Sequence, residues 1–157
     1  MRFGKKLILA VILLLLAGIA AVAWFFFTQQ PRRGFGIYLA WSNELVISDE
    51  DIVSYNRTSH EIRLTVGGVE KIKALKVPVT GIPFVIKING REIYAGSFWT
   101  SFSSLSYSGI VIDTLKIQNY TIKIEKGYPS SAFFKGVDPR NNSEIFNYFQ
   151  EKGKLVQ

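Results

Sequence analysis

The chain has 157 residues, 48% of them hydrophobic and 20% charged, and a formal net charge of +7 at pH 7. It has no cysteine, which excludes disulfides, thiol nucleophiles, zinc–thiolate sites and a lipid anchor on a cysteine. Residues 1–33 carry five basic residues and no acid, so residues 34–157 hold fourteen basic against twelve acidic residues. This second part is close to neutral, and nucleic acid is therefore not an expected partner.

An apolar run without a charged residue extends from Leu7 to Phe27. As a helix it would be roughly 30 Å long, which matches the hydrocarbon core of a bilayer. Basic residues flank the run on both sides, and its last four residues are aromatic, as at a membrane interface. The run therefore predicts a transmembrane anchor over residues 7–27, with the lipid bilayer as its partner.

The basic residues beside this run predict its orientation. Three precede it and two follow it, and the more basic flank is expected to stay in the cytoplasm. Residues 1–6 would then be a cytoplasmic tail, residues 28–33 a linker, and residues 34–157 a single extracytoplasmic domain. The sequence thus indicates a single-pass protein of the cell membrane. The flanking basic residues are Arg2, Lys5, Lys6, Arg32 and Arg33.

A cleaved secretory signal is the alternative for the same run, because Ala21, Val22 and Ala23 match the small-residue pattern of a cleavage site. The apolar region of such a signal has typically about 7 to 15 residues. Here the run is already longer at Ala23 and continues through aromatic residues. Its length favours an uncleaved signal anchor.

Two strands and a short helix are predicted at the start of the domain. Residues 35–41 are apolar on both faces, which is typical of a central strand, and residues 45–47 form a second strand. Ser48 followed by Asp51 is the signature of a helix start. The acidic residues 49–51 could hold a cation, but they lack the spacing of a calcium loop, so no metal is expected.

A strand, a helix and a hairpin follow. Apolar residues alternate over residues 60–66, which predicts a strand, and recur at helical spacing over residues 69–75. Residues 84–88 and 91–95 have strand patterns and are joined by Asn89-Gly90. This pair is preferred in type I′ hairpin turns because both central positions need a positive φ.

The remaining chain predicts a loop, two strands and a last helix. Residues 97–108 are rich in serine and predict the loop, whereas residues 110–112 and 120–124 have strand patterns. Asp138-Pro139 predicts the start of a helix that ends before Gly153. The fold class is therefore α+β, with a largely antiparallel sheet and two or three helices. The apolar face of the last helix is expected at Ile145, Phe146 and Phe149.

We expect the domain to be a binding or accessory module for another envelope protein or a surface ligand, because an anchor raises its local concentration. The stretch from Arg91 to Tyr107 is the candidate surface, since aromatic rings among hydroxyl groups suit recognition. The same rings could instead cover one end of the core. The candidate partner-binding residues are Arg91, Tyr94, Phe98, Trp99, Phe102 and Tyr107.

A small membrane-bound hydrolase is the alternative function. It would use His60, a serine of residues 97–108 and an acid such as Asp113. The sequence has neither a Gly-x-Ser-x-Gly nor a Ser-x-x-Lys motif, and His60 is in register with the apolar face of its strand. We therefore expect no catalytic residue and no cofactor.

Three Asn-x-Ser/Thr tripeptides permit N-glycosylation if the domain faces a compartment with that machinery. Such tripeptides arise often by chance, so they add little to the predicted orientation. The possible acceptors are Asn56, Asn119 and Asn141.

Overall fold

The computed structural model describes residues 4, 12, 14–19 and 34–157. The described residues before position 20 are helical. No helix among the described residues is long and apolar enough to cross a membrane. The remaining residues of the predicted anchor, 7–27, and the linker, 28–33, lie outside the described part, so the anchor stays a prediction.

Residues 34–157 belong to one compact unit. It contains ten strands, two α-helices and two short 3-10 helices. In chain order these are β1 (Phe35–Leu39), β2 (Leu45–Ser48), η1 (Asp49–Asp51), β3 (Ile52–Asn56), β4 (Glu61–Leu64), α2 (Val66–Ala74), β5 (Ile82–Ile88), β6 (Arg91–Trp99), β7 (Tyr107–Asp113), β8 (Thr121–Lys123), β9 (Glu125–Tyr128), η2 (Ser131–Phe133), α3 (Ser143–Glu151) and β10 (Leu155–Val156).

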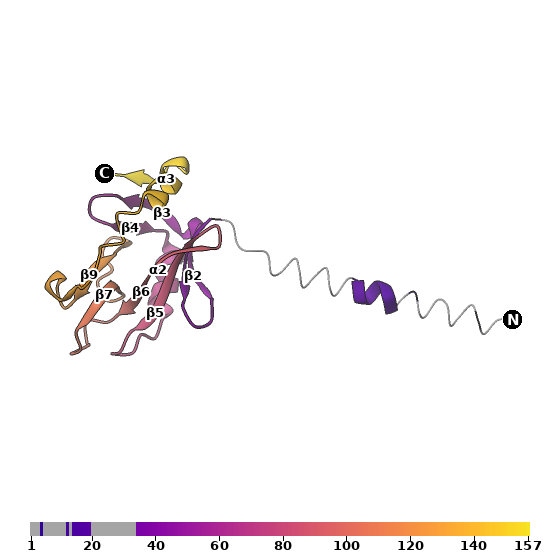
Figure 1. Cartoon of the computed structure of the whole chain (residues 1–157), viewed down its shortest axis with the longest axis horizontal. Coiled ribbons are helices and arrows are strands. Elements are labelled where there is room, and N and C mark those ends of the chain that lie inside the picture. The colour runs from indigo at the N-terminus through magenta and orange to yellow at the C-terminus, as the bar shows by residue number, and fades with distance from the viewer. Residues whose placement is uncertain (1–3, 5–11, 13, 20–33) are drawn as a thin grey trace. The chain divides into compact units, whose positions relative to one another are not determined.

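The strands form two sheets (Figure 1). Sheet A has the order β2-β1-β5-β6-β7-β9, and sheet B has the order β10-β3-β4-β8. Neighbouring strands are antiparallel except for the pairs β6–β7 and β10–β3. The predicted α+β class with mostly antiparallel strands is thus confirmed.

The predicted hairpin is the turn between β5 and β6. Asn89 and Gly90 both have positive φ, 51° and 82°, as a type I′ turn requires. Ile88 pairs with Arg91 directly across the turn. Along β5 every second side chain is buried, which places one face of sheet A in the core. The inward residues of β5 are Ile82, Phe84, Ile86 and Ile88.

Helix α3 contacts both sheets through aromatic residues, and Phe149 contacts the two of them at once. The ring of Phe149 stacks on Tyr55 of β3 with the centroids 5.1 Å apart, and it lies 4.9 Å from the ring of Phe35 of β1. Since β3 belongs to sheet B and β1 to sheet A, these contacts join both sheets in a single hydrophobic core.

The predicted start of α3 is wrong. The helix begins after Asn142, whose side-chain oxygen accepts hydrogen bonds from the backbone N–H groups of Glu144 and Ile145. Asp138 instead forms two hydrogen bonds with the guanidinium of Arg140, and these bonds hold the pKa of its carboxyl group well below the usual range. Asp138, which the sequence assigned to a helix cap, is thus part of a local ion pair.

The predicted loop over residues 97–108 is also too long. Strand β6 continues to Trp99 and β7 begins at Tyr107, so only residues 100–106 connect them. The reason is the parallel pairing of Ser97 with Val111 and of Trp99 with Asp113, which brings serine-rich sequence into a sheet. Pairing with other strands also produces three strands that the sequence did not indicate, β3, β9 and β10.

Candidate functional site

The structure divides the six candidate partner-binding residues into two groups. Tyr94, Phe98 and Trp99 are buried. These rings therefore serve packing, and their assignment to a binding surface is corrected. Arg91 is exposed and forms an ion pair with Glu144 of α3. The other two residues, Phe102 and Tyr107, lie in and just after the connection between β6 and β7.

Trp99 lies in a small aromatic cluster outside the main core. Its indole ring stacks on Tyr107 with the centroids 5.1 Å apart and lies 5.7 Å from the ring of Tyr128. Gly81 approaches so closely that an added Cβ atom would lie 2.5 Å from the indole ring. The Nε1 donor of Trp99 is buried and has no hydrogen-bond partner within the described part of the chain.

The connection between β6 and β7 is held by hydrogen bonds to three other segments. The Ser103 hydroxyl donates to the Val79 carbonyl at 2.6 Å and accepts from the Leu105 backbone N–H at 3.2 Å. The Tyr128 hydroxyl donates to the carbonyls of Ser101 and Ser103, and the Ser101 hydroxyl donates to the Asp113 carboxylate. Residues 100–106 therefore have a defined conformation.

Three apolar side chains surround Ser103 and point into solvent. Phe102 is 83% exposed, and Val79 and Leu105 are about half exposed. We call Val79, Phe102 and Leu105 the Phe102 patch. Residues 77–86 and 93–112, which supply the patch and its surroundings, contain no charged side chain.

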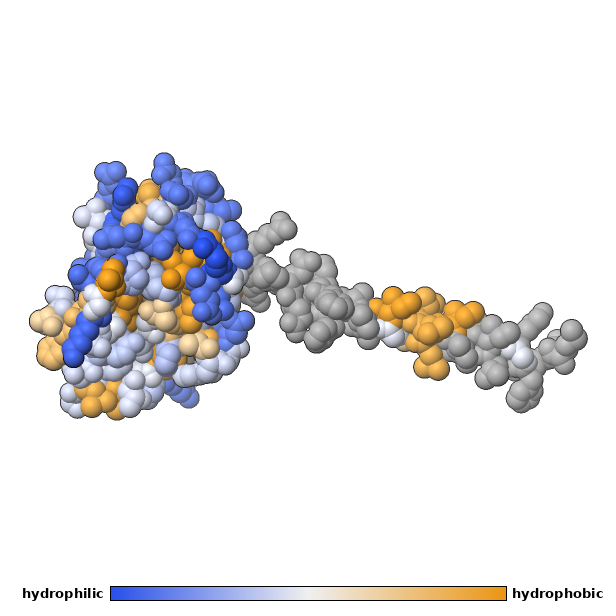
Figure 2. All heavy atoms as spheres, in the orientation of Figure 1, coloured by the Kyte–Doolittle hydropathy of each residue, from blue (hydrophilic) through white to orange (hydrophobic). Residues whose placement is uncertain are grey.

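The Phe102 patch lies near the end of sheet A where β5 begins and β6 ends. Gly34, the first described residue of the domain, lies at the other end of β5. Its backbone N–H donates to the Asn89 side-chain oxygen, and its carbonyl accepts from the Asn89 backbone N–H. Figure 2 shows many strongly hydrophilic residues at the end of the domain that carries α3, further ones along its sides, and paler or apolar residues over much of the opposite end. Asp113, at the end of β7, and Lys116, just after it, are charged residues near the patch.

His60 is not assembled with the residues that the hydrolase alternative requires. Its side chain is buried, and Nδ1 lies 3.1 Å from the Tyr55 hydroxyl. Asp113 is bonded to Ser101 and to the backbone N–H of Leu115. Among residues 34–157 no hydrogen bond joins His60 to a serine or to Asp113, so the geometry gives the hydrolase alternative no support.

Burial of His60 predicts a dependence of stability on pH. Burial lowers its pKa, and the charge of Arg140 acts in the same direction. Histidine in the unfolded chain titrates near pH 6.5. Below that pH the unfolded state binds a proton that the folded state does not bind, so stability is full above pH 6.5 and falls as the pH decreases.

We expect urea denaturation of the fragment 34–157 to show this loss between pH 8 and pH 5. Carboxylates titrate in part of the same range, so His60→Asn is the matched variant. Asparagine tolerates the φ of 55° at this position and has no titratable group. The stability difference between wild type and variant should change below pH 6.5. A constant difference at all pH values would contradict the prediction.

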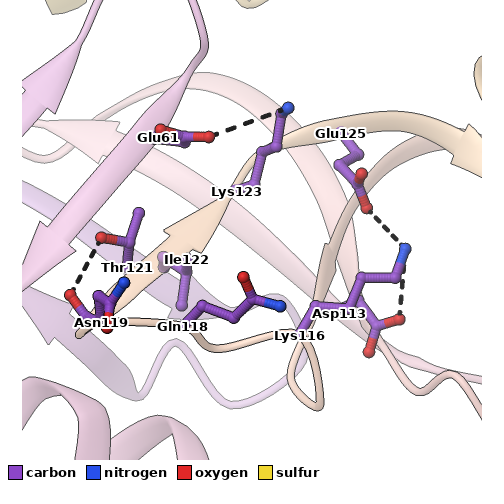
Figure 3. A pocket seen from close by; sticks show the side chains of 9 residues that line it. All are labelled: Glu61, Asp113, Lys116, Gln118, Asn119, Thr121, Ile122, Lys123 and Glu125. Carbon is purple, nitrogen blue, oxygen red and sulfur yellow. Dashed lines mark hydrogen bonds and ion pairs between the residues drawn. The ribbon is translucent and has the colours of Figure 1, made fainter.

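A polar pocket of about 380 Å³ lies between β8 and the segment that follows β7 (Figure 3). Lys116 lies 3.2 Å from Glu125 and 3.8 Å from Asp113, and Lys123 lies 3.9 Å from Glu61. The lysines and the carboxylates thus compensate one another, and we assign no chemistry to this pocket. Its lining residues are Glu61, Asp113, Lys116, Gln118, Asn119, Thr121, Ile122, Lys123 and Glu125.

Asp49 and Asp51, two of the three acidic residues 49–51, take part in structural ion pairs. Asp51 accepts hydrogen bonds from Lys71 at 2.8 Å and from Ser48, while Asp49 pairs with Lys154 at 3.2 Å. Burial acts to raise the pKa of Asp51, but these hydrogen bonds outweigh it, and the pKa is lowered. Within the described residues, no three His, Asp or Glu side chains are placed to share a metal ion.

The three possible glycosylation acceptors differ in their surroundings. Asn119 and Asn141 are exposed. Asn56 is partly buried, and its side-chain oxygen accepts hydrogen bonds from the backbone N–H groups of Thr58 and Ser59. Asn56 is therefore engaged in its own turn.

Comparison of the chain with protein-family models, with curated proteins and with solved structures finds no match.

Proposed function

We propose that this chain is a single-pass membrane protein whose domain, residues 34–157, lies outside the cytoplasm and binds another envelope protein. The uncharged run 7–27 and its basic flanks support the anchor and its orientation. The docking surface is the Phe102 patch. The observation that carries the proposal is the exposure of the Phe102 ring on a loop that hydrogen bonds hold in place.

An exposed aromatic ring on an ordered loop is suited to binding for a physical reason. Association costs free energy for every side chain and loop that must be immobilised. Here Ser103 and Tyr128 already fix the backbone on both sides of Phe102, so little of that cost remains. Serine hydroxyls around the ring add hydrogen-bonding groups that adapt to a partner.

The charge of the surface indicates the kind of partner. Nucleic acid and anionic lipid head groups are bound through lysine and arginine, and residues 77–86 and 93–112 contain neither. Gly34, the first described residue of the domain, lies at the other end of β5 from the patch. The occupant is therefore an uncharged, apolar surface of another protein.

Photo-crosslinking in cells tests this function. A photoreactive amino acid at the exposed Ser104 of the full-length chain should capture one protein of different mass. Phe102→Ala should reduce the yield of that product by at least about ten-fold, since an aromatic anchor contributes about 2 kcal/mol or more to binding. The matched control is Val137→Ala, which removes a side chain 92% exposed outside the patch and should leave the yield unchanged.

Several outcomes would contradict the proposal. These are an equal yield from wild type and Phe102→Ala, an equal loss in the control, or capture of a second copy of this chain alone.

Protease added to intact spheroplasts should degrade the domain in every variant. A domain that is degraded only after lysis would overturn the proposed orientation.

A further inference from the structure

A second pocket, of about 270 Å³, lies where β9 leads into η2. Three basic side chains line it, together with one acid and two serine hydroxyl groups. The lining residues are Lys123, Glu125, Lys126, Gly127, Pro129, Ser130, Ser131 and Arg140. The pocket belongs to β8, β9, η2 and the segment before α3, and it is separate from the Phe102 patch.

Arg140 is the fixed cation of this pocket. Its side chain is 11% exposed, Nε and one terminal nitrogen donate to Asp138, and the other terminal nitrogen donates to the Ile124 carbonyl at 2.8 Å. A guanidinium has five N–H groups. Three of them are used by protein oxygens in the described part of the chain, which leaves two for a ligand.

The carboxylates near the pocket are already engaged. Asp138 is shared between Arg140 and Lys126, whose Nζ lies 3.4 Å away. Glu125 lies 3.2 Å from Lys116, outside this pocket. Lys123 has only a distant ion pair, 3.9 Å from Glu61 (Figure 3). Among the residues that line the pocket three are cationic and one is anionic, whereas Asp138 and Glu61, which pair with these cations, do not belong to the lining.

The serine hydroxyls are held beside these cations by a tight turn. Gly127 has a φ of 66°, and an added Cβ atom would lie 2.7 Å from the backbone of Ser130 and of Phe134. The backbone N–H of Phe133 donates to the Ser130 carbonyl, and that of Phe134 donates to the Ser131 carbonyl. The turn thus fixes the backbone of Ser130 and Ser131, which line the pocket together with Lys126.

From this arrangement we infer that the pocket binds a phosphate group. Three cations and two hydroxyl groups match the charge and the several oxygens of a phosphate better than those of a carboxylate. The volume accommodates a phosphate and a small group attached to it. The phosphate could belong to a free anion or to a lipid head group, and the inference does not depend on the proposed binding of a protein.

The test is calorimetric titration of the full-length chain, in a non-ionic detergent at low ionic strength, with inorganic phosphate. The double variant Lys123→Gln/Lys126→Gln should bind at least about ten-fold more weakly, because each lysine donates a charge-assisted hydrogen bond. The matched control is Lys73→Gln/Lys76→Gln, which changes the net charge equally at exposed positions in and after α2 and should bind as wild type does. Lys123→Arg/Lys126→Arg should retain binding.

A second titration, with dihexanoyl phosphatidic acid below its micellar concentration, distinguishes the two sources of phosphate. Affinity at least ten-fold above that of inorganic phosphate indicates a lipid head group, and equal affinity indicates a free anion. The inference is overturned if wild type binds neither compound, if the Gln variant binds as wild type does, or if the α2 control loses affinity equally. The melting temperature of each variant shows whether it is folded.

Discussion

Replacing Trp99 with alanine is expected to lower the free energy of unfolding by about 3 to 5 kcal/mol. The side chain is 3% exposed and packs against Tyr107, Tyr128 and Gly81, so its removal leaves a cavity that a tight turn and two fixed rings cannot fill. Urea denaturation of the fragment 34–157 measures the change. The fragment is suitable because every core residue in the described part of the chain lies within it.

Two further variants separate packing of Trp99 from other effects. Trp99→Phe keeps most of the ring and removes the buried Nε1 donor, which has no partner among the described residues, so it should cost less than about 1.5 kcal/mol. Phe102→Ala, three residues away, should change the stability by less than about 0.5 kcal/mol because its ring is exposed. A small loss for Trp99→Ala, or a large loss for Phe102→Ala, would contradict the assignment of the two rings.

Phe149→Ala is expected to have an effect of similar size, about 3 to 5 kcal/mol. Its ring is fully buried and contacts both Tyr55 of sheet B and Phe35 of sheet A, so the variant removes a side chain of α3 that packs on both sheets. Denaturant unfolding followed by circular dichroism gives the loss of stability.

The exposed neighbour Gln150 provides the control for this variant. Gln150→Ala lies on the same helix and should change the stability by less than about 0.5 kcal/mol. If Phe149→Ala unfolded at the same urea concentration as Gln150→Ala, α3 would not contribute to the core as described.

The features that the sequence predicts correctly in the domain are local. Asn89-Gly90 forms the hairpin turn because positive φ at two adjacent positions selects these residues wherever the strands pair. Ser48 and Asp51 form the predicted capping box, since that motif involves residues three positions apart. The spacing of Ile145, Phe146 and Phe149 likewise identifies the buried face of α3.

The errors arise where segments distant in the chain pair with each other. Strand β10 exists because Leu155 and Val156 pair with β3, about a hundred residues earlier in the chain. One further error, the start of α3, is local: Asp138 binds Arg140, and Asn142 caps the helix. The guanidinium of Arg140 also donates to the Ile124 carbonyl, a contact between segments sixteen residues apart that the sequence does not indicate.

In the candidate site, too, the sequence predicts local features, whereas contacts between distant segments decide the rest. By itself the sequence determined that the stretch from Arg91 to Tyr107 combines aromatic and hydroxyl side chains, and hence that a surface formed from it would suit recognition of a partner. It could not determine that Trp99 is buried while Phe102 is exposed, because both stand in the same serine-rich stretch. Only the tertiary structure decided this, since the parallel pairing of β6 with β7 places Trp99 in a sheet beneath neighbouring rings and leaves Phe102 in the connection beyond it.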